Sequence, residues 1–453
     1  MTTMTSHVEP AQSILIIGLG LTGLSCARFL TQRGFVVAIM DTRAKPPALP
    51  TLQEELPEVI VNTGSLEPKL IQQADLIVLS PGIDPRLAEI VAAKEAGIEI
   101  VGDIELFARY CNAPVVAITG SNGKSTVTTL LAEMAKTSGK RIQVGGNLGT
   151  PALDLIMYPA PDFYIVELSS FQLETVTTLN AFVATVLNVS PDHLDRYDNE
   201  QAYQAAKATI FNGDGVMIIN RDDDNVVQLA RANRKQIGFS LQASDGLDFG
   251  VIIHNDEPWL AEGSQPLMAV AELNIKGTHN TANALSALAL GSAMGLSMVA
   301  MLKTLHLYKG LAHRCRLVLE NDGVQWFNDS KATNVGACIA AIEGLATSGR
   351  IILIAGGVGK DQNFSELTAV IEQHVVEMIV LGQDADRIEA ILPEEMIAYR
   401  ASDMSDAVKQ AHSLAKEGEI VLLSPACASF DMFSGYEQRG RVFEKNVGAL
   451  VHD

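Results

Sequence analysis

Two glycine-rich segments of this sequence carry the residue types that bind phosphate. The more specific one is TGSNGKST, residues 119–126, between the apolar run PVVAI and a helix-like stretch. In such a P-loop, backbone N–H groups cradle a β-phosphate, Lys124 neutralises β- and γ-phosphate oxygens, and a hydroxyl reaches Mg²⁺. The general pattern has glycine where Ile118 stands, so this loop is a variant. The residues expected to bind a nucleoside triphosphate are Gly120, Ser121, Asn122, Gly123, Lys124, Ser125 and Thr126.

The second segment is GLGLTG, residues 18–23, which follows the strand-like SILII and opens a helix-like stretch. It matches the GxGxxG arrangement, whose glycines let the backbone approach a diphosphate at a helix N-terminus. Asp41 ends the next strand-like run, where an acid can take a ribose hydroxyl. NAD is the default ligand, but the pattern reports only a diphosphate nucleotide. A tight turn without a ligand is the alternative.

An acidic residue should stand beside the P-loop to bind its metal ion. Glu167 lies at the carboxyl end of the apolar run FYIVE, and ligands gather at such ends in open α/β sheets. His193 follows the next apolar run, FVATVLNV, and can supply a nitrogen ligand or hold a substrate oxygen. A hydrogen-bonded surface histidine is the competing interpretation of His193.

The composition narrows the class of protein. The 453 residues have a formal charge of −20, which repels nucleic acid and anionic lipid, so we expect no nucleic-acid partner. The five dispersed cysteines form no CxxC pair, and residues 1–12 lack the pattern of a signal peptide, which fits a cytoplasmic protein. The uncharged stretch 284–302 predicts a buried helix pair broken near Gly291 or Gly295, not a membrane insertion.

Strand-like apolar runs alternate with helix-like stretches in three series, which is the rhythm of parallel sheets with crossover helices. We therefore predict three α/β domains. Residues 1–102 would form a Rossmann-like nucleotide-binding domain, 103–309 a central P-loop ATPase-like domain, and 310–453 a C-terminal Rossmann-like domain. No short repeat appears, so solenoids are excluded.

Further segments occur in the order found in the Mur ligases, and the chain resembles that family over essentially its whole length. The P-loop elements alone would fit any member of the superfamily, including folylpolyglutamate synthetases. NDSKATN, SPACASFD and the dinucleotide-like first domain point to the members that use D-glutamate. One departure is Val358, where an aspartate is expected. The matching segments are GLGLTGLS, SPGI, TGSNGKST, ELSSFQLE, NVSPDHLDRY, AYQAAKATIF, GTHNTANALSALAL, GLAHRCRLV, FNDSKATNV and LLSPACASFDMFSGYEQRG.

The resemblance implies a reaction and its partners. ATP would phosphorylate the carboxylate of UDP-N-acetylmuramoyl-L-alanine, and the amine of D-glutamate would attack the acyl phosphate. The glycine loop of the first domain would then hold a uridine diphosphate group and not NAD. The residues implied for this UDP end are Gly20, Leu21, Thr22, Asp41, Thr42, Arg43, Ser80 and Gly82. The enzyme is expected to act as a monomer.

The resemblance also implies roles near the reacting groups. One Mg²⁺ would bind at Ser125 or Thr126 with Glu167, and a second at His193 with a carbamylated Lys207. A lysine on a largely buried face loses hydration, so its pKa falls and its neutral amine can add CO₂. Asn147 would contact substrate near the reacting groups.

The remaining implied residues belong to ATP and D-glutamate. Asn280 would sit by the adenine, Arg314 would reach the ATP phosphates, and Asp329 would hold the ribose. The residues implied for D-glutamate are Lys331, Thr333, Ser424 and Phe430.

Two other classes of protein compete with a ligase as interpretations of the sequence. One is an oxidoreductase that uses the first glycine loop for NAD, and no hydride-transfer site accompanies that loop. The other is a regulatory or motor ATPase, and no arginine-rich partner surface supports it.

Overall fold

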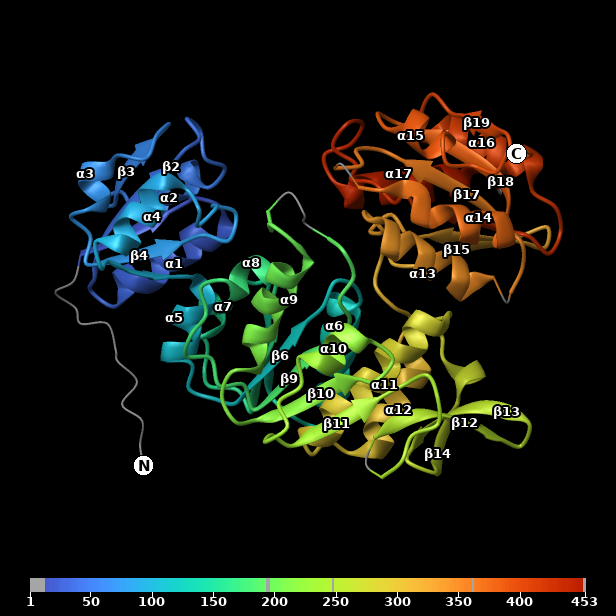
Figure 1. The fold of residues 1–453 in the computed structure, drawn as a ribbon, viewed down its shortest axis with the longest axis horizontal. Coiled ribbons are helices and arrows are strands. Elements are labelled where there is room, and N and C mark those ends of the chain that lie inside the picture. Colours follow the sequence, from blue (N-terminus) through green and yellow to red (C-terminus); the bar gives the residue numbers. More distant parts are fainter. Residues whose placement is uncertain (1–12, 193–195, 247, 347, 361, 451–453) are drawn as a thin grey trace.

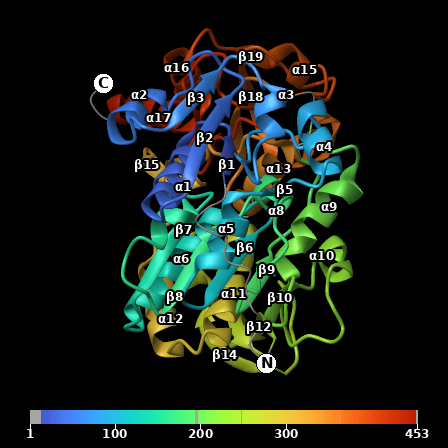
Figure 2. The same ribbon diagram turned by 90° about the vertical axis from the view of Figure 1, so that its left-hand side faces the viewer.

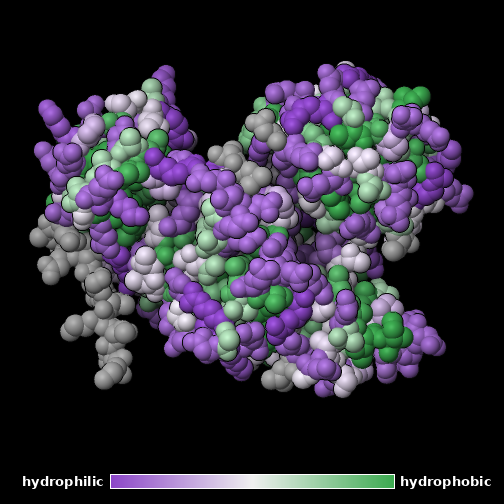
Figure 3. Space-filling model, in the orientation of Figure 1, coloured by the Kyte–Doolittle hydropathy of each residue, from purple (hydrophilic) through white to green (hydrophobic). Residues whose placement is uncertain are grey.

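The computed structural model describes residues 13–192, 196–246, 248–346, 348–360 and 362–450, so His193 lies outside the described residues. The chain forms three sheets in succession, each with its own helices (Figure 1). The three-domain α/β architecture expected from the sequence is confirmed. In the space-filling view a notch separates the first and third domains above the second (Figure 3).

The first domain is a parallel sheet in the order β3-β2-β1-β4-β5. Its strands are β1 (Ser13–Ile17), β2 (Val36–Asp41), β3 (Ile60–Thr63), β4 (Leu76–Leu79) and β5 (Glu99–Val101). Its helices are α1 (Leu21–Gln32), α2 (Leu49–Glu55), α3 (Pro68–Ile71) and α4 (Ala88–Glu95). Because the strand order reverses between β1 and β4, the loops that follow these two strands meet at a crevice.

The second domain is a mixed sheet in the order β14-β13-β12-β11-β10-β9-β6-β8-β7. Its strands are β6 (Val115–Thr119), β7 (Ile142–Gly146), β8 (Phe163–Glu167), β9 (Val183–Val186), β10 (Val216–Asn220), β11 (Gln236–Phe239), β12 (Phe249–His254), β13 (Glu257–Glu262) and β14 (Gln265–Ala269). Its helices are α5 (Asp103–Tyr110), α6 (Lys124–Thr137), α7 (Ala152–Leu155), α8 (Ser170–Leu173), α9 (Glu200–Ala208), α10 (Asp224–Gln228), α11 (Thr278–Ala293) and α12 (Met298–Leu307), with 3₁₀ turns at Thr209–Phe211 and Val270–Glu272.

Strand β6 explains why the P-loop has a rigid base. Val115 and Ala117 belong to the core on one face of the sheet, and Val116 and Ile118 to the core on the other. A strand that is covered on both faces must be apolar at every position, and this one is paired on both sides by β8 and β9. The loop that follows β6 therefore starts from a fixed point.

The third domain is a sheet in the order β15-β16-β20-β17-β18-β19, parallel except for the β15–β16 pair. Its strands are β15 (Arg316–Asn321), β16 (Val324–Asn328), β17 (Ile351–Gly356), β18 (Val375–Leu381), β19 (Ala398–Arg400) and β20 (Ile420–Leu423). Its helices are α13 (Val335–Leu345), α14 (Leu367–His374), α15 (Ala385–Glu389), α16 (Met404–Leu414) and α17 (Tyr436–Ala449), with a 3₁₀ turn at Phe364–Glu366.

The prediction from the sequence did not include the antiparallel edge formed by β12, β13 and β14. Its strands are partly exposed and so lack the continuous apolar runs that marked the parallel ones. The sequence does contain a local turn signal, the pair Asn255 and Asp256. In the structure both residues have positive φ, 52° and 62°, and turn the chain between β12 and β13.

The alanine-rich stretch forms two helices, as predicted. The break lies at Gly295, whose φ is +71°, between α11 and α12. Gly291 is inside α11, where an added Cβ would lie 2.3 Å from the sulfur of Met301. Across the described ranges, no helix combines the length and apolarity that crossing a membrane requires.

Helix α5 begins one residue after the predicted domain boundary at residue 102 and packs against α7 and α8 of the second domain. Its Glu105 carboxylate accepts hydrogen bonds from the Thr177 and Thr178 N–H groups at 2.8 and 2.9 Å, and from Arg109 Nε at 3.0 Å. Burial alone would raise the pKa of Glu105, but these donors outweigh it and hold the pKa below its usual value.

We predict that Glu105→Gln lowers the free energy of unfolding by about 2–4 kcal/mol at pH 7, because it leaves buried donors without an anion. A carboxyl whose folded-state pKa is depressed stabilises the fold above its unfolded pKa and loses this effect as pH falls through the folded value. The difference between the two proteins should therefore shrink in acid. Denaturant titrations at several pH values measure this difference.

Glu55→Gln is the control, at an exposed pair with Arg28, and should lower the free energy of unfolding by less than about 1 kcal/mol. A pH-independent difference would contradict the assignment.

Candidate functional site

The P-loop connects β6 to α6 and leaves the N-terminus of α6 open. Gly120 and Gly123 have φ values of +153° and +81°, which side chains rarely adopt. A Cβ at Gly123 would also lie 2.5 Å from Asn283 Oδ1. The loop therefore requires glycine at both positions. The N-terminus of α6, which no side chain caps, and the positive end of its dipole form a site that suits an anion.

Two lysines, the half-buried Lys124 and the buried Lys207, share one backbone oxygen of this loop. Lys124 Nζ and Lys207 Nζ donate to the carbonyl oxygen of Gly120 at 2.8 and 2.9 Å. Burial lowers the pKa of both side chains, and the charge of Lys124 lowers that of Lys207 further. Lys207 is 1% exposed, and its ammonium lies 4.5 Å from the centre of the Tyr203 ring. The sequence prediction of a buried, low-pKa lysine at position 207 agrees with this geometry.

Glu167 stands at the end of β8, beside the loop. Its Oε1 accepts from Asn147 Nδ2 at 2.7 Å, whereas its Oε2 is buried and has no hydrogen-bond partner among the described residues. Such an orphaned carboxylate oxygen fits a hard cation, which prefers oxygen ligands. The described part of the chain holds no group of three His, Cys, Asp or Glu side chains able to bind a metal. Of the loop hydroxyls predicted to share a metal ion with Glu167, Ser125 Oγ accepts a hydrogen bond from Arg314 Nη2 at 2.8 Å.

A cavity of about 340 Å³, here called the nucleotide cavity, lies between the second and third domains. Asn280, Arg314 and Asp329 all line it, together with loop residues of the second domain. The Asp329 carboxylate accepts from Cys315 N at 3.0 Å and from Ser424 Oγ at 2.9 Å, and burial raises its pKa to about 7. Three side chains predicted for ATP are thus brought to one cavity beside the P-loop.

A second cavity, about 450 Å³ in volume and here called the diphosphate cavity, lies between the first and second domains. Most residues predicted for the UDP end line it: Gly20, Leu21, Thr22, Thr42, Arg43, Ser80 and Gly82. Asp41 does not line it. Its buried carboxylate accepts from Leu19 N at 2.7 Å and from the Arg43 guanidinium, so Asp41 supports the glycine turn and aims Arg43.

A third cavity, about 420 Å³ in volume and here called the central cavity, joins the other two. It shares Pro81, Gly82 and Asn147 with the diphosphate cavity. With the nucleotide cavity it shares Asn122, Gly123, Arg314 and Lys331. Lys124, Glu167 and Lys207 line only the central cavity, which therefore lies where two nucleotide ligands would meet.

The third domain brings two of the four predicted D-glutamate residues to the central cavity, Lys331 and Thr333. The Lys331 ammonium lies 4.0 Å from the centre of the Tyr436 ring, and burial together with the charges of Arg314 and Lys124 lowers its pKa to about 8. Ser424 is fully buried, and its hydroxyl binds Asp329. The ring of Phe430 is 73% exposed. Neither Ser424 nor Phe430 lines the central cavity.

Sequence reasoning missed several residues that line the central cavity, namely Ser169, Ser170, Asp192, Tyr203, Lys360 and Tyr436. Lys360 has a positive φ of 49° and follows the glycines after β17, the strand covered on both faces. A glycine-rich loop after a buried strand is a signal for a ligand site, so Lys360 was detectable. The unexpected Val358 pairs its backbone with Ala428.

Three family models match successive parts of the chain. They are the MurD-like N-terminal domain of Mur ligases at residues 12–102, the Mur ligase middle domain at 118–291, and the glutamate ligase domain of Mur ligases at 313–427.

Similar proteins cover nearly the full length. The UDP-N-acetylmuramoylalanine--D-glutamate ligase of Nitrosococcus oceani is 51% identical, with 98% of each chain covered. The Pseudomonas aeruginosa protein of the same name is 48% identical over 96% of this chain and 98% of its own. The solved UDP-N-acetylmuramate-alanine ligase of Thermotoga maritima has a TM-score of 0.60 at 17% identity, with 97% and 100% covered, a likeness of fold alone. Together with the three domain matches, these full-length relatives show that the chain belongs to the Mur ligase family.

Proposed function

We propose that this chain joins D-glutamate to UDP-N-acetylmuramoyl-L-alanine, with cleavage of ATP to ADP and phosphate, in the synthesis of peptidoglycan precursors. Relatives that carry this activity in their names are about half identical over the full length. The observation that carries the proposal is the central cavity, which joins a diphosphate cavity to a P-loop nucleotide cavity. A ligase needs this connection, whereas an NAD-dependent oxidoreductase does not.

The first step brings two anions together. The uridine diphosphate would lie against the glycine loop, which directs the L-alanine carboxylate past Asn147 into the central cavity. ATP would lie in the nucleotide cavity with its γ-phosphate toward Lys124. A carboxylate oxygen then attacks the γ-phosphorus, ADP leaves, and an acyl phosphate forms. Lys124 stabilises the charge on the transferred group, since fixed charges in a buried site act strongly on a transition state.

The second step needs an amine and no water. D-glutamate would bind through its carboxylates to Lys331 and Lys360, which line the central cavity together with Thr333. Its neutral amine attacks the acyl carbon, and phosphate departs as the amide forms. Because the third domain supplies these residues, its contact with the second domain also covers the acyl phosphate and limits hydrolysis.

One Mg²⁺ fits the orphaned oxygen of Glu167, with Ser125 or Thr126 as a further ligand, and this proposal places a second Mg²⁺ at His193 and a carbamate on Lys207. Bound there, the ions would screen the charges of the phosphate and the carboxylate. For the carbamate, the neutral amine of Lys207 forms a C–N bond to CO₂ and loses one proton. The product carries a negative charge on two oxygens, which removes the repulsion between Lys207 and Lys124.

The proposal includes a monomer in the cytoplasm. The residues assigned to the three cavities all lie in one chain, which supports a monomer. The five cysteines are free thiols, which suits a reducing compartment.

ADP release should require both UDP-N-acetylmuramoyl-L-alanine and D-glutamate, and Lys124→Ala should lower kcat by about 100-fold or more through loss of transition-state stabilisation. Calorimetry should show that this variant still binds the UDP substrate, because the diphosphate cavity is separate. Lys136→Ala is the matched control, at an exposed lysine on the same helix. ADP release that requires an amino acid other than D-glutamate would refute the assignment. Tight binding of NAD in place of the UDP substrate would refute it as well.

Lys207→Ala should lose most activity, because it removes the carbamate. Bicarbonate or short carboxylic acids should restore part of it by placing a carboxylate in the space left. The same additives should do nothing for Lys124→Ala, where a cation is missing. An intact mass that shows a bare amine in the Mg²⁺-loaded wild type, or full activity of Lys207→Ala, would remove the carbamate from the mechanism.

Lys331→Ala should raise the KM for D-glutamate far more than the KM for ATP. In the wild type, the lysine loses its proton as pH rises through about 8, so the KM for D-glutamate should increase above that pH. Lys331→Arg keeps its charge and should abolish this increase, although its planar group raises the KM at neutral pH. Equal changes in both KM values, or an unchanged pH profile in Lys331→Arg, would count against the pairing.

A further inference from the structure

The diphosphate cavity has walls from two different domains. The first domain supplies the glycine loop and the turn at residues 80–83, and the second supplies residues 146–151 and Gln172. The two walls belong to separate sheets, so no strand pairing fixes the distance between them. The width of the cavity therefore depends on side chains that connect the domains. Figure 2 shows the first-domain strands β1, β2 and β3 above β6, β7 and β8 of the second domain.

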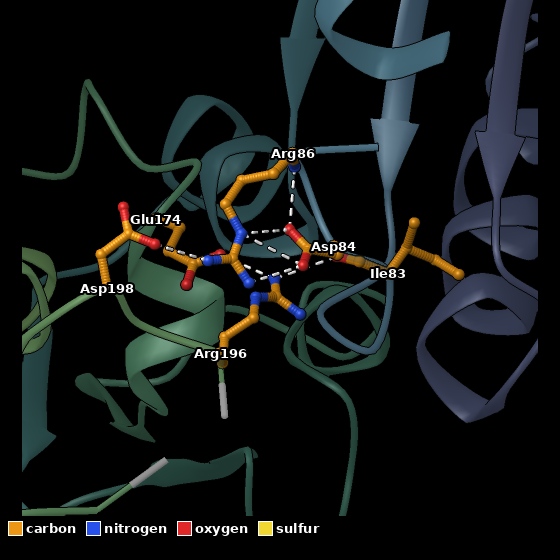
Figure 4. A network of polar contacts seen from close by, with 6 residues as sticks. All are labelled: Ile83, Asp84, Arg86, Glu174, Arg196 and Asp198. Atoms are coloured by element: carbon orange, nitrogen blue, oxygen red, sulfur yellow. Dashed lines mark hydrogen bonds and ion pairs between the residues drawn. The ribbon is translucent and has the colours of Figure 1, made fainter. Parts of the chain in front are cut away.

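Arg196 of the second domain makes such a connection (Figure 4). Its Nη2 donates to the carbonyl oxygen of Ile83 in the first domain at 3.0 Å and to Glu174 Oε2 at 2.7 Å. Its guanidinium carbon lies 4.7 Å from the centre of the Phe171 ring. The Arg196 side chain is only 11% exposed and that of Glu174 only 14%. A planar guanidinium can stack on a ring and bind two oxygens at the same time.

On the first-domain side, this contact reaches the glycine loop through one turn. Ile83 N donates to the Ser80 carbonyl oxygen at 2.9 Å, which closes the turn. Ser80 Oγ donates to the Gly18 carbonyl oxygen at 2.8 Å. The packing here is tight, since a Cβ on Gly18 would lie 2.8 Å from the Cβ of Ser80. A shift of Ile83 would therefore move the loop proposed to hold the diphosphate.

On the second-domain side, the partners of Arg196 sit on α8. Glu174 caps the C-terminus of this helix, and Phe171 lies within it. The same helix carries Gln172, which lines the diphosphate cavity, and its N-terminus is held by a capping box between Ser169 and Gln172. Arg196 thus binds one structural element from each wall of the cavity.

We propose that Arg196 is a positioning residue for the UDP substrate: it fixes the turn at residues 80–83 against α8 and so sets the width of the diphosphate cavity. This inference rests on the proposed function. Arg196 lines none of the three cavities, so it acts through Ile83 and Glu174 and does not touch the substrate.

A second arginine in the same network provides a matched control. Arg86 binds Asp84 on its own loop at 2.8 Å and crosses to Asp198 of the second domain at 3.0 Å. The side chains of Arg86 and Asp198 are 47% and 81% exposed. Exposed ion pairs are screened by water and salt and contribute little. Arg86 also crosses the seam between the domains, but without burial or a contact to the turn backbone of Ile83.

The test compares Arg196→Ala, Arg196→Lys and Arg86→Ala in the full-length protein. Calorimetry gives the Kd of UDP-N-acetylmuramoyl-L-alanine, and ADP release gives KM values for all three substrates. We expect Arg196→Ala to raise the Kd and KM of the UDP substrate by about tenfold or more, because a buried charged hydrogen bond is lost. The KM for ATP should change by less than about twofold. Arg196→Lys should be intermediate, millimolar guanidinium should partly rescue Arg196→Ala, and Arg86→Ala should stay within about twofold of wild type.

The ATP measurement separates positioning from general loosening of the chain. Ser190, six residues before Arg196 in the chain, is bonded to the P-loop: its N donates to Ser121 Oγ at 3.0 Å. Equal increases in KM for ATP and the UDP substrate would therefore overturn the proposal, as would an unchanged Kd in Arg196→Ala. If Arg196→Ala does not fold, Arg196→Lys carries the same comparison. Wild-type protein that fails to bind the UDP substrate would instead refute the proposed function.

Discussion

A local excess of basic side chains around one cavity is the constraint on which the rest of this structure depends. Of the described residues that line the central cavity, five are basic and two are acidic: Lys124, Lys207, Arg314, Lys331 and Lys360 against Glu167 and Asp192. The chain as a whole has a charge of −20, so this arrangement runs against the average field of the molecule. Burial lowers the pKa values of Lys124, Lys207 and Lys331, and the neighbouring cations Lys124 and Arg314 lower them further. Anionic substrates relieve this repulsion, so the same electrostatic attraction favours both substrate binding and catalysis.

The backbone must hold these cations in place before any substrate arrives. The Gly120 carbonyl oxygen accepts both Lys124 and Lys207, and it can do so because the loop bends in a conformation available to glycine. Strand β6, covered on both faces, anchors the loop. The apolar core therefore determines where the charges sit, and the mechanism depends on the packing beneath it.

All three cavities lie at domain boundaries or open onto them. The diphosphate cavity depends on the contact between the first and second domains, and the nucleotide cavity on that between the second and third. Contacts such as Arg196 with Ile83 and Arg314 with Ser125 connect domains that share no sheet. A few polar side chains thus control geometry that no single domain specifies, and closure or opening can change the site without refolding any sheet.

The sequence by itself determined the three α/β domains, both glycine loops and the positions of Lys124 and Glu167, because phosphate loops and buried parallel strands depend on local residue order. Lys207 was singled out by the family resemblance, because the residues alone show only a lysine among alanines on a helix. The antiparallel edge at β12–β14 was missed because partly exposed strands lack a long apolar run. Only the tertiary structure decided that Lys360 and Tyr436 join Lys331 at one cavity, that Ser424 supports Asp329, and that Asp41 aims Arg43. Each of these facts depends on which segments distant in the chain come together, and residue spacing along the chain does not encode those distances.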